Sequence, residues 1–406
     1  MNNKLWNKNF CLVTAATVLG SAGAIAGGFA LSFFIYDETK STLASALIIA
    51  IRLIPTTIVP LFISPLMDRL PRKAFLVCGD IVNGTVYAAM GIWLLFNSFS
   101  YIGYLVISFL LACLDSVDEL AYTSIYPELI PKGEEEKGYS VSSMLYPILQ
   151  VIMMPAAGLL LDKIGVPNLL IIQSALSFSA AVTESFIKIE KKQPLSKNYS
   201  IKLWVNDIKE ALLYLKKEKG LRSIFEYMAV TNGVAMGFSP VLIAFFRTAS
   251  GFSAGIYSFF SVAEFAGRTL GSMVQYKIKI PDTKKYGFVF LVYQIYETMD
   301  MCLLWLPYPP MLVNRGICGF LGNNSAIIRN AAVQRYIPEN LRSRVNAFDG
   351  ILGTAAGGLL TLLVGFLGEV LDYRQCITLC GAIAITASWM LILGRKKEVK
   401  RIYVMR

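Results

Sequence analysis

Long apolar runs that carry almost no charge recur along this chain, and two of them flank a short basic block. Residues 43–66 contain a single charged side chain, Arg52, and residues 74–99 contain only Asp80. An apolar run of about 18 or more residues is long enough to cross a hydrocarbon core of roughly 30 Å as a helix. The block at residues 64–73 holds three cations, which places it in the cytoplasm by the positive-inside rule. The two runs are therefore predicted to form a helical hairpin in a membrane.

The same pattern continues to the end of the chain and predicts twelve membrane-spanning helices. They are placed at residues 10–36, 42–66, 74–97, 101–127, 139–162, 167–188, 222–247, 253–276, 285–306, 309–334, 344–368 and 373–394. Basic residues gather in alternate connecting segments, so both termini are predicted to be cytoplasmic. The expected fold class is an all-α membrane protein with twelve transmembrane helices in two pseudo-symmetric six-helix bundles.

The overall composition agrees with a membrane protein and excludes several other classes. Of the 406 residues, 55% are hydrophobic and 16% are charged, a balance that excludes a soluble protein. The formal net charge of +11 is concentrated in alternating loops, so it indicates topology rather than nucleic-acid binding. All seven cysteines lie in apolar runs without metal-ligand spacing and are interpreted as packing residues. No metal or other cofactor is expected.

One long polar segment, residues 189–221, separates the two predicted bundles, which comprise residues 1–188 and 222–406. The second bundle ends in a basic tail. Within the polar segment, apolar residues from Leu203 to Leu215 recur at helical spacing beside lysines. This pattern predicts an amphipathic helix on the inner membrane face, and a flexible basic linker is the alternative.

The two halves also repeat each other at an offset of 207 residues. The offset pairs Pro60 with Gly267, Gly158 with Gly365, and Asp162 with Glu369. A Gly-x-x-x-Gly pattern at residues 23–27 is echoed at residues 233–237. Transporters are commonly built from such repeats, with the substrate site between the halves near the bilayer midplane.

The basic block resembles the cytoplasmic signature of the major facilitator superfamily, whose usual form is Gly-x-x-x-Asp-Arg-x-Gly-Arg-Lys. The matching residues are Asp68, Arg69, Arg72 and Lys73. Ser64 and Pro71 stand where the signature has glycine; Ser is small, and Pro is compatible with a turn. An ordinary basic loop is the alternative reading of this block.

The resemblance implies a gating role for the signature. Asp68 would accept hydrogen bonds at the N-terminus of the eleventh helix, around residues 343–344, where the helix dipole favours an anion. Arg72 would pair with an acid of the same half, either Glu128 or Glu134. Contacts of this kind exist in only one access state and so set the balance between the two states.

Within the superfamily, the chain is most similar to bacterial drug, macrolide and siderophore exporters. Two loops carry this similarity, at residues 126–134 after the fourth helix and at residues 334–346 before the eleventh. The resemblance implies the export of an amphiphilic small molecule.

Ionisable side chains at membrane depth are costly and usually face a cavity or a partner, so they are the candidates for chemistry. Asp115, Asp118 and Glu119 lie near the middle of the fourth predicted helix, at spacings of three and four residues that put them on one face. Three carboxylates in a medium of low dielectric do not all stay ionised, so one of them is expected to bind the coupled proton.

The alternative is that these acids pair with cations of other helices. The candidate cations are Arg52, Arg268, Arg315 and Arg329. Glu264 and Arg268 are four residues apart and are expected to satisfy each other, with a substrate role as the alternative. Glu184 is expected at the membrane interface, and Glu297 and Asp300 are expected to be peripheral.

We therefore predict an alternating-access carrier in a bacterial plasma membrane that exports an amphiphilic molecule in exchange for protons and works as a monomer. A proton- or sodium-coupled importer is the alternative, because a fold does not settle direction. A lipid-acting membrane enzyme is disfavoured because the chain contains no His. A non-transporting sensor is disfavoured because the tails and the linker are too short for a soluble signalling domain.

Overall fold

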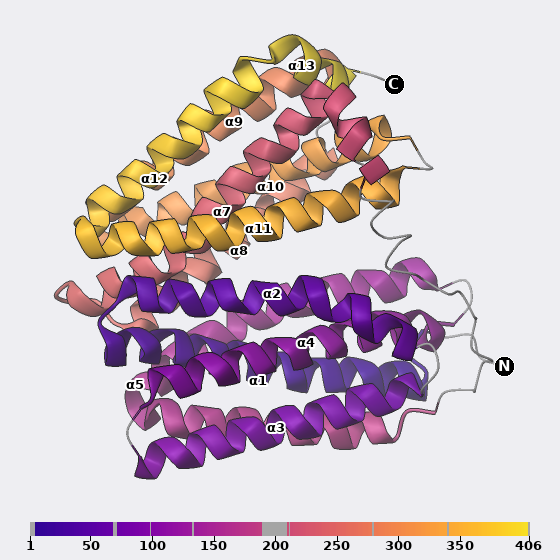
Figure 1. Cartoon of the computed structure of the whole chain (residues 1–406), viewed down its shortest axis with the longest axis vertical. Helices are drawn as coiled ribbons and strands as arrows, with labels where there is room; N and C mark the ends of the chain where they lie inside the picture. Colours follow the sequence, from indigo (N-terminus) through magenta and orange to yellow (C-terminus); the bar gives the residue numbers. More distant parts are fainter. Residues whose placement is uncertain are drawn as a thin grey trace. The chain divides into compact units, whose positions relative to one another are not determined.

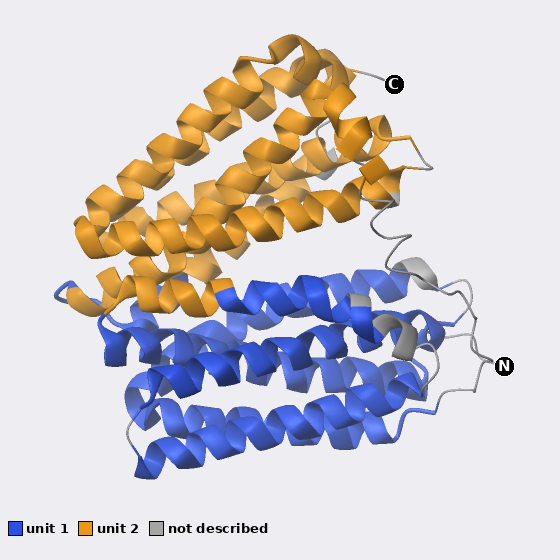
Figure 2. Cartoon of the chain, viewed as in Figure 1, with its two compact units in different colours: residues 1–40, 51–198, 249–259 blue, residues 41–50, 199–248, 260–406 orange. Residues whose placement is uncertain are grey.

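The computed structural model describes residues 5–67, 71–97, 99–131, 134–188, 209–210, 212–277, 280–338 and 341–404. Within these ranges the regular structure is entirely helical, and no strand occurs (Figure 1). The chain divides into two compact units, which Figure 2 colours separately. Unit 1 comprises residues 1–40, 51–198 and 249–259, and unit 2 comprises residues 41–50, 199–248 and 260–406.

The helices in the first half of the chain are long. They are α1 (Lys8–Thr39), α2 (Thr42–Met67), α3 (Arg72–Phe96), α4 (Tyr101–Leu129) and α5 (Glu135–Ser185). The first turns of α1 and α4 are capped by side chains, since Asn7 accepts from the amide of Phe10 and Ser100 from that of Gly103. Both caps satisfy amides that have no partner within the helix.

α5 is two helices that meet at a break. Gly165 has φ 74° and ψ 172°, a conformation in the positive-φ region that favours glycine. Pro167 follows two residues later, and proline cannot continue the hydrogen-bond ladder of a preceding helix. The break separates the predicted helices at residues 139–162 and 167–188, which account for the fifth and sixth membrane spans.

The second half of the chain contains the remaining helices. They are α7 (Lys219–Thr248), α8 (Ala254–Lys277), α9 (Asp282–Cys302) with a 3-10 turn (Leu303–Trp305), α10 (Tyr308–Tyr336), α11 (Arg342–Val370), α12 (Tyr373–Ala387) with a π-helical extension (Ser388–Leu393), and α13 (Lys396–Val404). The first turn of α12 is capped by Asp372, which accepts from the amide of Arg374.

Nine helices of the described chain are long and apolar enough to cross a bilayer. α8 and α10 have the length, with 24 and 29 residues, but carry more polar side chains. The prediction of an all-α membrane protein is confirmed, and the predicted helix positions match the structure closely. Each unit is built around the packing of its own helices.

Glycines set the closest helix contacts in both units. A Cβ at Gly27 of α1 would lie 1.4 Å from Oε1 of Gln173, so a larger residue would force this side chain of α5 to move. In unit 2, a Cβ at Gly237 of α7 would lie 2.5 Å from the Cβ of Val364 in α11. The Gly-x-x-x-Gly patterns of the two halves therefore have the same structural role, since each lets a neighbouring helix pack closely.

The basic tail of the second bundle is a folded helix, α13, that packs against α7 and α9. Val399, Ile402 and Tyr403 on one face of α13 are 0%, 1% and 2% exposed, while its lysines and arginine face outward. These three residues belong to the main apolar core of unit 2. Burial raises the pKa of Tyr403 well above its ordinary value.

Candidate functional site

An ion pair joins α2 to α4 inside unit 1. Nη2 of Arg52 donates to Oδ2 of Asp115 at 2.8 Å, and the two side chains are 37% and 44% exposed. Asp115 is thus paired with Arg52, one of the four candidate cations. The two side chains thus neutralise each other while remaining only partly enclosed by other residues of the described chain.

The other two acids of α4 have different surroundings. Asp118 points towards α3, where a Cβ at Gly79 would lie 3.5 Å from its Oδ1. Asp118 is also within electrostatic range of Asp80, Asp115 and Glu119. Glu119 itself is exposed. The three acids thus occupy one stretch of α4 but not one environment, because Asp118 is turned into the bundle.

Two carboxylates from other helices join Asp118 inside unit 1. Glu184, near the end of α5, is 7% exposed, and its Oε2 has no hydrogen-bond partner among the described residues. It lies within electrostatic range of Asp80 in α3 and of Asp118. Glu184 lies at the end of its helix, as the sequence predicts, and its side chain is buried in the helix bundle.

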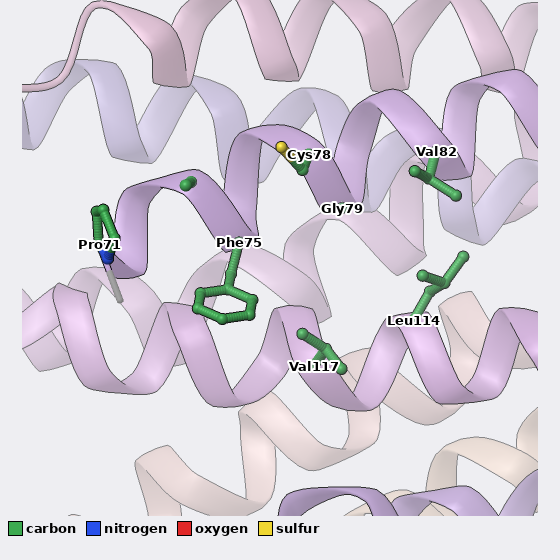
Figure 3. A pocket seen from close by; sticks show the side chains of 8 residues that line it. Pro71, Phe75, Cys78, Gly79, Val82, Leu114 and Val117 are labelled. Atoms are coloured by element: carbon green, nitrogen blue, oxygen red, sulfur yellow. The ribbon is translucent and has the colours of Figure 1, made fainter. Parts of the chain in front are cut away.

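An apolar pocket of about 360 Å³ lies between α3 and α4 (Figure 3). Its lining consists of Pro71, Ala74, Phe75, Cys78, Gly79, Val82, Leu114 and Val117. None of the predicted site residues lines it. Two lining residues, Gly79 and Val117, directly precede Asp80 and Asp118 in the sequence. The pocket therefore offers apolar contacts next to helix positions that carry acids.

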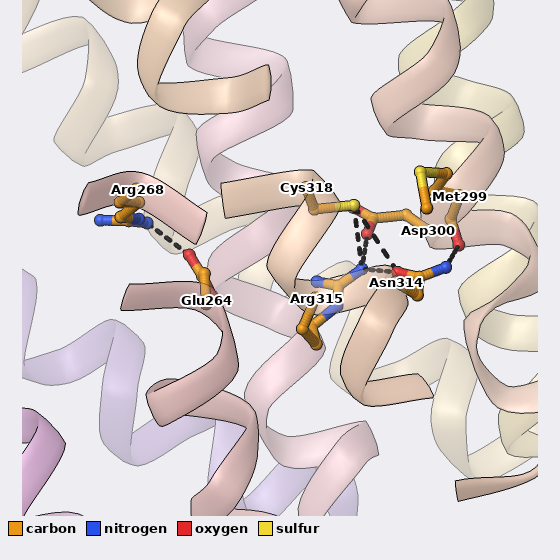
Figure 4. Close-up of polar contacts among 7 residues, drawn as sticks. All are labelled: Glu264, Arg268, Met299, Asp300, Asn314, Arg315 and Cys318. Carbon is orange, nitrogen blue, oxygen red and sulfur yellow. Dashed lines mark hydrogen bonds and ion pairs between the residues drawn. The ribbon is translucent and has the colours of Figure 1, made fainter. Parts of the chain in front are cut away.

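In unit 2, a buried ion pair joins α10 to α9 (Figure 4). Nη2 of Arg315 donates to Oδ1 of Asp300, and the two side chains are 8% and 5% exposed. Arg315 also donates to Oδ1 of Asn314 at 3.0 Å. Asn314 in turn donates to the carbonyl of Met299 at 2.8 Å. Arg315 thus has its partner within its own unit.

The expectation that the acids of the ninth helix are peripheral was wrong. Glu297 and Asp300 are 6% and 3% exposed, respectively, and Glu297 lies within electrostatic range of Arg315. A buried guanidinium needs a counter-ion in the low-dielectric interior. For Arg315 of α10, this counter-ion is Asp300 of α9. Asp300 is therefore a buried structural partner of Arg315, whereas the sequence predicted a peripheral position.

The remaining charged candidates of unit 2 have local partners. Nη2 of Arg268 donates to Oε1 of Glu264 at 2.5 Å, which is the pair that their spacing predicts (Figure 4). The side chain of Arg268 is 61% exposed. Nη1 of Arg329 donates to the hydroxyl of Tyr293 at 3.5 Å. Arg329 is thus tied to an aromatic part of the unit 2 core.

Half of the signature block is described. Asp68 and Arg69 lie outside the described residues, and so does the side chain of residue 343 at the start of α11. Nη1 of Arg72 donates to Oε1 of Glu128 at 3.4 Å and to the carbonyl of Ser124 at 3.2 Å. Glu128 is thus the acid that Arg72 meets, of the two proposed.

Lys73, the last residue of the signature, links two helices. Its Nζ donates to the carbonyl of Ser185 at 2.5 Å, which ties the start of α3 to the end of α5. Most of the predicted amphipathic helix lies outside the described residues. Its described end contributes Glu210, which accepts from Nη1 of Arg344 at 2.5 Å.

The segment Gly251-Phe-Ser253-Ala-Gly255 has the Gly-x-Ser-x-Gly spacing of a hydrolase nucleophile. In the structure Ser253 begins α8 instead, since its Oγ accepts from the amide of Ile256 at 3.3 Å. The chain contains no His to act as the base of a Ser–His pair. Among the described residues, no group of acids and cysteines is arranged to hold a metal ion.

Comparison with known proteins identifies the family. The family model of the Major Facilitator Superfamily matches residues 12–295. The chain belongs to this superfamily. A curated relative, the uncharacterized MFS-type transporter YkuC of Bacillus subtilis (strain 168), is 25% identical over 294 residues, which are 67% of this chain. The match spans 66% of YkuC, slightly less than two thirds of its length.

Solved structures of several transporters share the fold. A mutant of the nucleoside transporter NupG has a TM-score of 0.74 at 10% identity, with 95% of this chain and 99% of the NupG chain covered. A POT family transporter in complex with 5-aminolevulinic acid has a TM-score of 0.73 at 11% identity, with 96% of each chain covered. A bacterial homologue of the human lysosomal transporter Spinster, in an inward-facing and unoccupied conformation, has a TM-score of 0.68 at 13% identity, with 97% of this chain and 96% of the homologue covered.

These matches confirm the predicted superfamily fold and agree with the prediction of a transporter rather than an enzyme. They also indicate a multi-pass membrane protein. At 10–13% identity the structural likeness shows the fold alone. Which of the charged residues of this superfamily member act in transport is therefore a question for the geometry of its own site.

Proposed function

We propose that this superfamily member is a secondary active transporter of a bacterial plasma membrane that exports an amphiphilic small molecule in exchange for protons. It would work by alternating access, as a monomer with both termini in the cytoplasm. The proposed substrates are drug-, macrolide- or siderophore-like, in keeping with the loops at residues 126–134 and 334–346.

The observation that carries this proposal is the partly exposed Arg52–Asp115 pair in α2 and α4. Ionisable side chains within membrane-spanning helices are costly and therefore often mark functional sites, and the two members of this pair are 37% and 44% exposed. Protonation of Asp115 would remove its charge and release Arg52. A step of this kind couples proton binding to a change in the contacts between two helices.

We assign the other predicted residues separate roles. Asp118 and Glu119 extend the acidic stretch of α4 and supply further sites for the coupled proton. Arg315 holds the fold through its buried pair, whereas Glu264, Arg268 and Arg329 are the candidates in unit 2 for contact with substrate. Their exposure or their aromatic surroundings suit an amphiphile.

We also propose that the signature controls the balance between access states. Arg72 and Lys73 tie the start of α3 to α4 and α5, so any movement of this end of α3 changes several contacts at once. We assign Asp68 and Arg69 to the same proposed gate. We propose the bundles at residues 1–188 and 222–406, joined by residues 189–221, as the bodies that move.

The test uses the purified protein in proteoliposomes with an imposed pH gradient and a panel of radiolabelled amphiphiles that includes a macrolide and tetraphenylphosphonium. The variant is Asp115→Asn, which keeps the shape of the side chain and removes the exchangeable charge. The matched control is Glu226→Gln, since Glu226 pairs with Arg222 of its own helix at 2.6 Å.

Export coupled to protons predicts that an inward-directed proton flow drives probe movement in the opposite direction, in the wild type and the control but not in Asp115→Asn. Probe movement in the same direction as the protons would replace export with symport. If transport depended on a sodium gradient instead, sodium rather than the proton would be the coupled ion. Transport that ignores both gradients and the substitution would leave Arg52–Asp115 a structural pair and refute active transport.

A further inference from the structure

A buried carboxylate inside unit 1 lacks a neutralising contact among the residues that the structure describes. Glu184 is 7% exposed, and its Oε2 accepts no hydrogen bond from any described residue. Two further acids, Asp80 and Asp118, lie within electrostatic range of it. Glu184 is buried and Asp80 and Asp118 are half-buried. Three carboxylates that act on one another in this way repel, so a bound positive charge stabilises the arrangement.

The three acids come from three helices whose ends meet. Lys73 at the start of α3 donates to the carbonyl of Ser185 at the end of α5, and Arg72 reaches Ser124 and Glu128 near the end of α4. The start of α3, the end of α4 and the end of α5 therefore lie at one end of unit 1. This end carries the cationic half of the signature.

Measured along their helices from that end, the acids lie at increasing depth. Glu184 is the penultimate residue of α5, Asp80 lies eight residues into α3, and Asp118 lies eleven residues before the end of α4. At 1.5 Å per residue, the last two offsets are about 12 Å and about 16 Å. Asp115 follows one turn deeper in α4, where it meets Arg52. The acids thus form a series that leads from the basic end of the unit to the Arg52–Asp115 pair.

We propose that Glu184, Asp80 and Asp118 form a proton-binding site inside unit 1 that relays protons between the Arg52–Asp115 pair and the basic end of the bundle. The proposal rests on the proposed proton-coupled function and names the route of the coupled ion. In each step one carboxylic acid releases a proton and the next carboxylate binds it, so the cluster keeps one proton and no group is oxidised or reduced.

A proton fits this site better than a metal ion. Among the described residues, no set of three acids or cysteines is arranged closely enough to hold a metal. A proton needs only one oxygen at a time. The other charged groups near these acids are Glu119, which is exposed at the level of Asp118, the Arg52–Asp115 pair on the deep side, and Lys73, whose Nζ donates to the carbonyl of Ser185 next to Glu184.

The test measures protonated carboxyl groups directly, without a substrate. Infrared difference spectra of the whole protein in lipid nanodiscs are recorded between alkaline and neutral pH, at fixed sodium concentration, and the carbonyl stretch of protonated carboxylic acids is followed. The variants are Glu184→Gln, Asp80→Asn and Asp118→Asn, whose amides keep the shape of the side chain. The control is Glu226→Gln, whose acid is paired within α7.

We expect the wild type and the control to show a carboxylic acid band near neutral pH, and the band to be lost or shifted in each of the three variants. Should Glu184→Gln not fold, Glu184→Asp keeps the carboxyl group and is expected to shift the band. A band that is absent from the wild type, or that survives in all three variants, overturns the proposal. A band that responds to sodium at constant pH also overturns it.

The same variants separate this proposal from the proposed function. In proteoliposomes with a pH gradient, tetraphenylphosphonium movement driven by the gradient should be lost in Glu184→Gln, while its exchange without a gradient is retained. If the infrared band behaves as expected but no probe responds to a pH gradient in the wild type, proton-coupled export fails and the binding site stands. If the gradient drives transport equally in wild type and variants, the relay fails and the function stands.

Discussion

Breaking the Arg315–Asp300 pair is expected to destabilise unit 2 strongly. The two side chains are 8% and 5% exposed, so water does not replace a lost partner. Removing one member of a buried pair typically costs about 3–5 kcal/mol, because the other charge stays buried and uncompensated. Asp300→Asn should therefore lower the free energy of unfolding by about that amount. An exposed pair contributes only about 0–1 kcal/mol, so burial is what makes the difference.

The matched comparison is the Arg222–Glu226 pair in α7, whose N–O distance is 2.6 Å and whose side chains are 51% and 28% exposed. Unfolding free energies are measured by SDS titration in mixed micelles for Asp300→Asn, Arg315→Met, the double variant and Glu226→Gln. The double variant should lose less than the sum of the two single losses, since no charge is left unpaired.

A loss of less than about 1 kcal/mol for Asp300→Asn, equal to that of Glu226→Gln, would refute the reasoning. It would mean that the guanidinium of Arg315 finds another counter-ion or reaches water when Asp300 is neutral. Strictly additive losses in the double variant would show that the two side chains do not act as a pair.

Three further predictions concern unit 2. Gly267→Ala should cost about 1–3 kcal/mol of unfolding free energy, because its Cβ would lie 1.9 Å from a backbone carbonyl of α10, whereas Gly353→Ala, with nothing within 4 Å, should cost nothing. Ile402→Ala should cost about 2–5 kcal/mol because it empties a buried position of α13, and the exposed Val404→Ala should change the same thermal unfolding signal little. Burial raises the pKa of Tyr403 above its ordinary value of 10, so the folded state keeps a proton that the unfolded state releases; stability should fall as pH rises above 10, and less steeply in Tyr403→Phe.

Most of the fold was predictable because membrane spans depend on the order of residues along the chain. Runs of apolar residues bounded by charge mark the helices, and the break at Gly165 is visible as a glycine followed by a proline. The tail was harder. Its composition indicates only a basic segment. Val399, Ile402 and Tyr403 come together as an apolar face only once this segment forms the helix α13, and they are buried only because other helices of unit 2 pack against that face.

The site was predictable only where the partners are close in sequence. The Glu264–Arg268 pair follows from their four-residue spacing on one helix. The Arg315–Asp300 pair depends on which faces of α9 and α10 meet, and spacing within one helix does not contain that information. For the same reason the reading of α4 grouped Asp118 with Glu119, although neighbours in sequence are about 100° apart around a helix and these two face different surroundings.

Asp80 and Glu184 of unit 1 were not predicted as site residues, although the sequence contains a signal for them. Asp80 and Glu184 are more than a hundred residues apart, and each stands in an apolar run, where a lone acid has no assigned partner. Both nevertheless lie within eight residues of a basic loop, at the ends of helices that the positive-inside rule puts on the same side of the membrane. Depth counted from the basic loops thus assigns acids of different helices to the same end of the bundle before any contact is known. What it leaves undetermined is whether they face each other, and that depends on the rotation of α3, α4 and α5 about their own axes, which is set by packing contacts such as the one between Gly79 and Asp118.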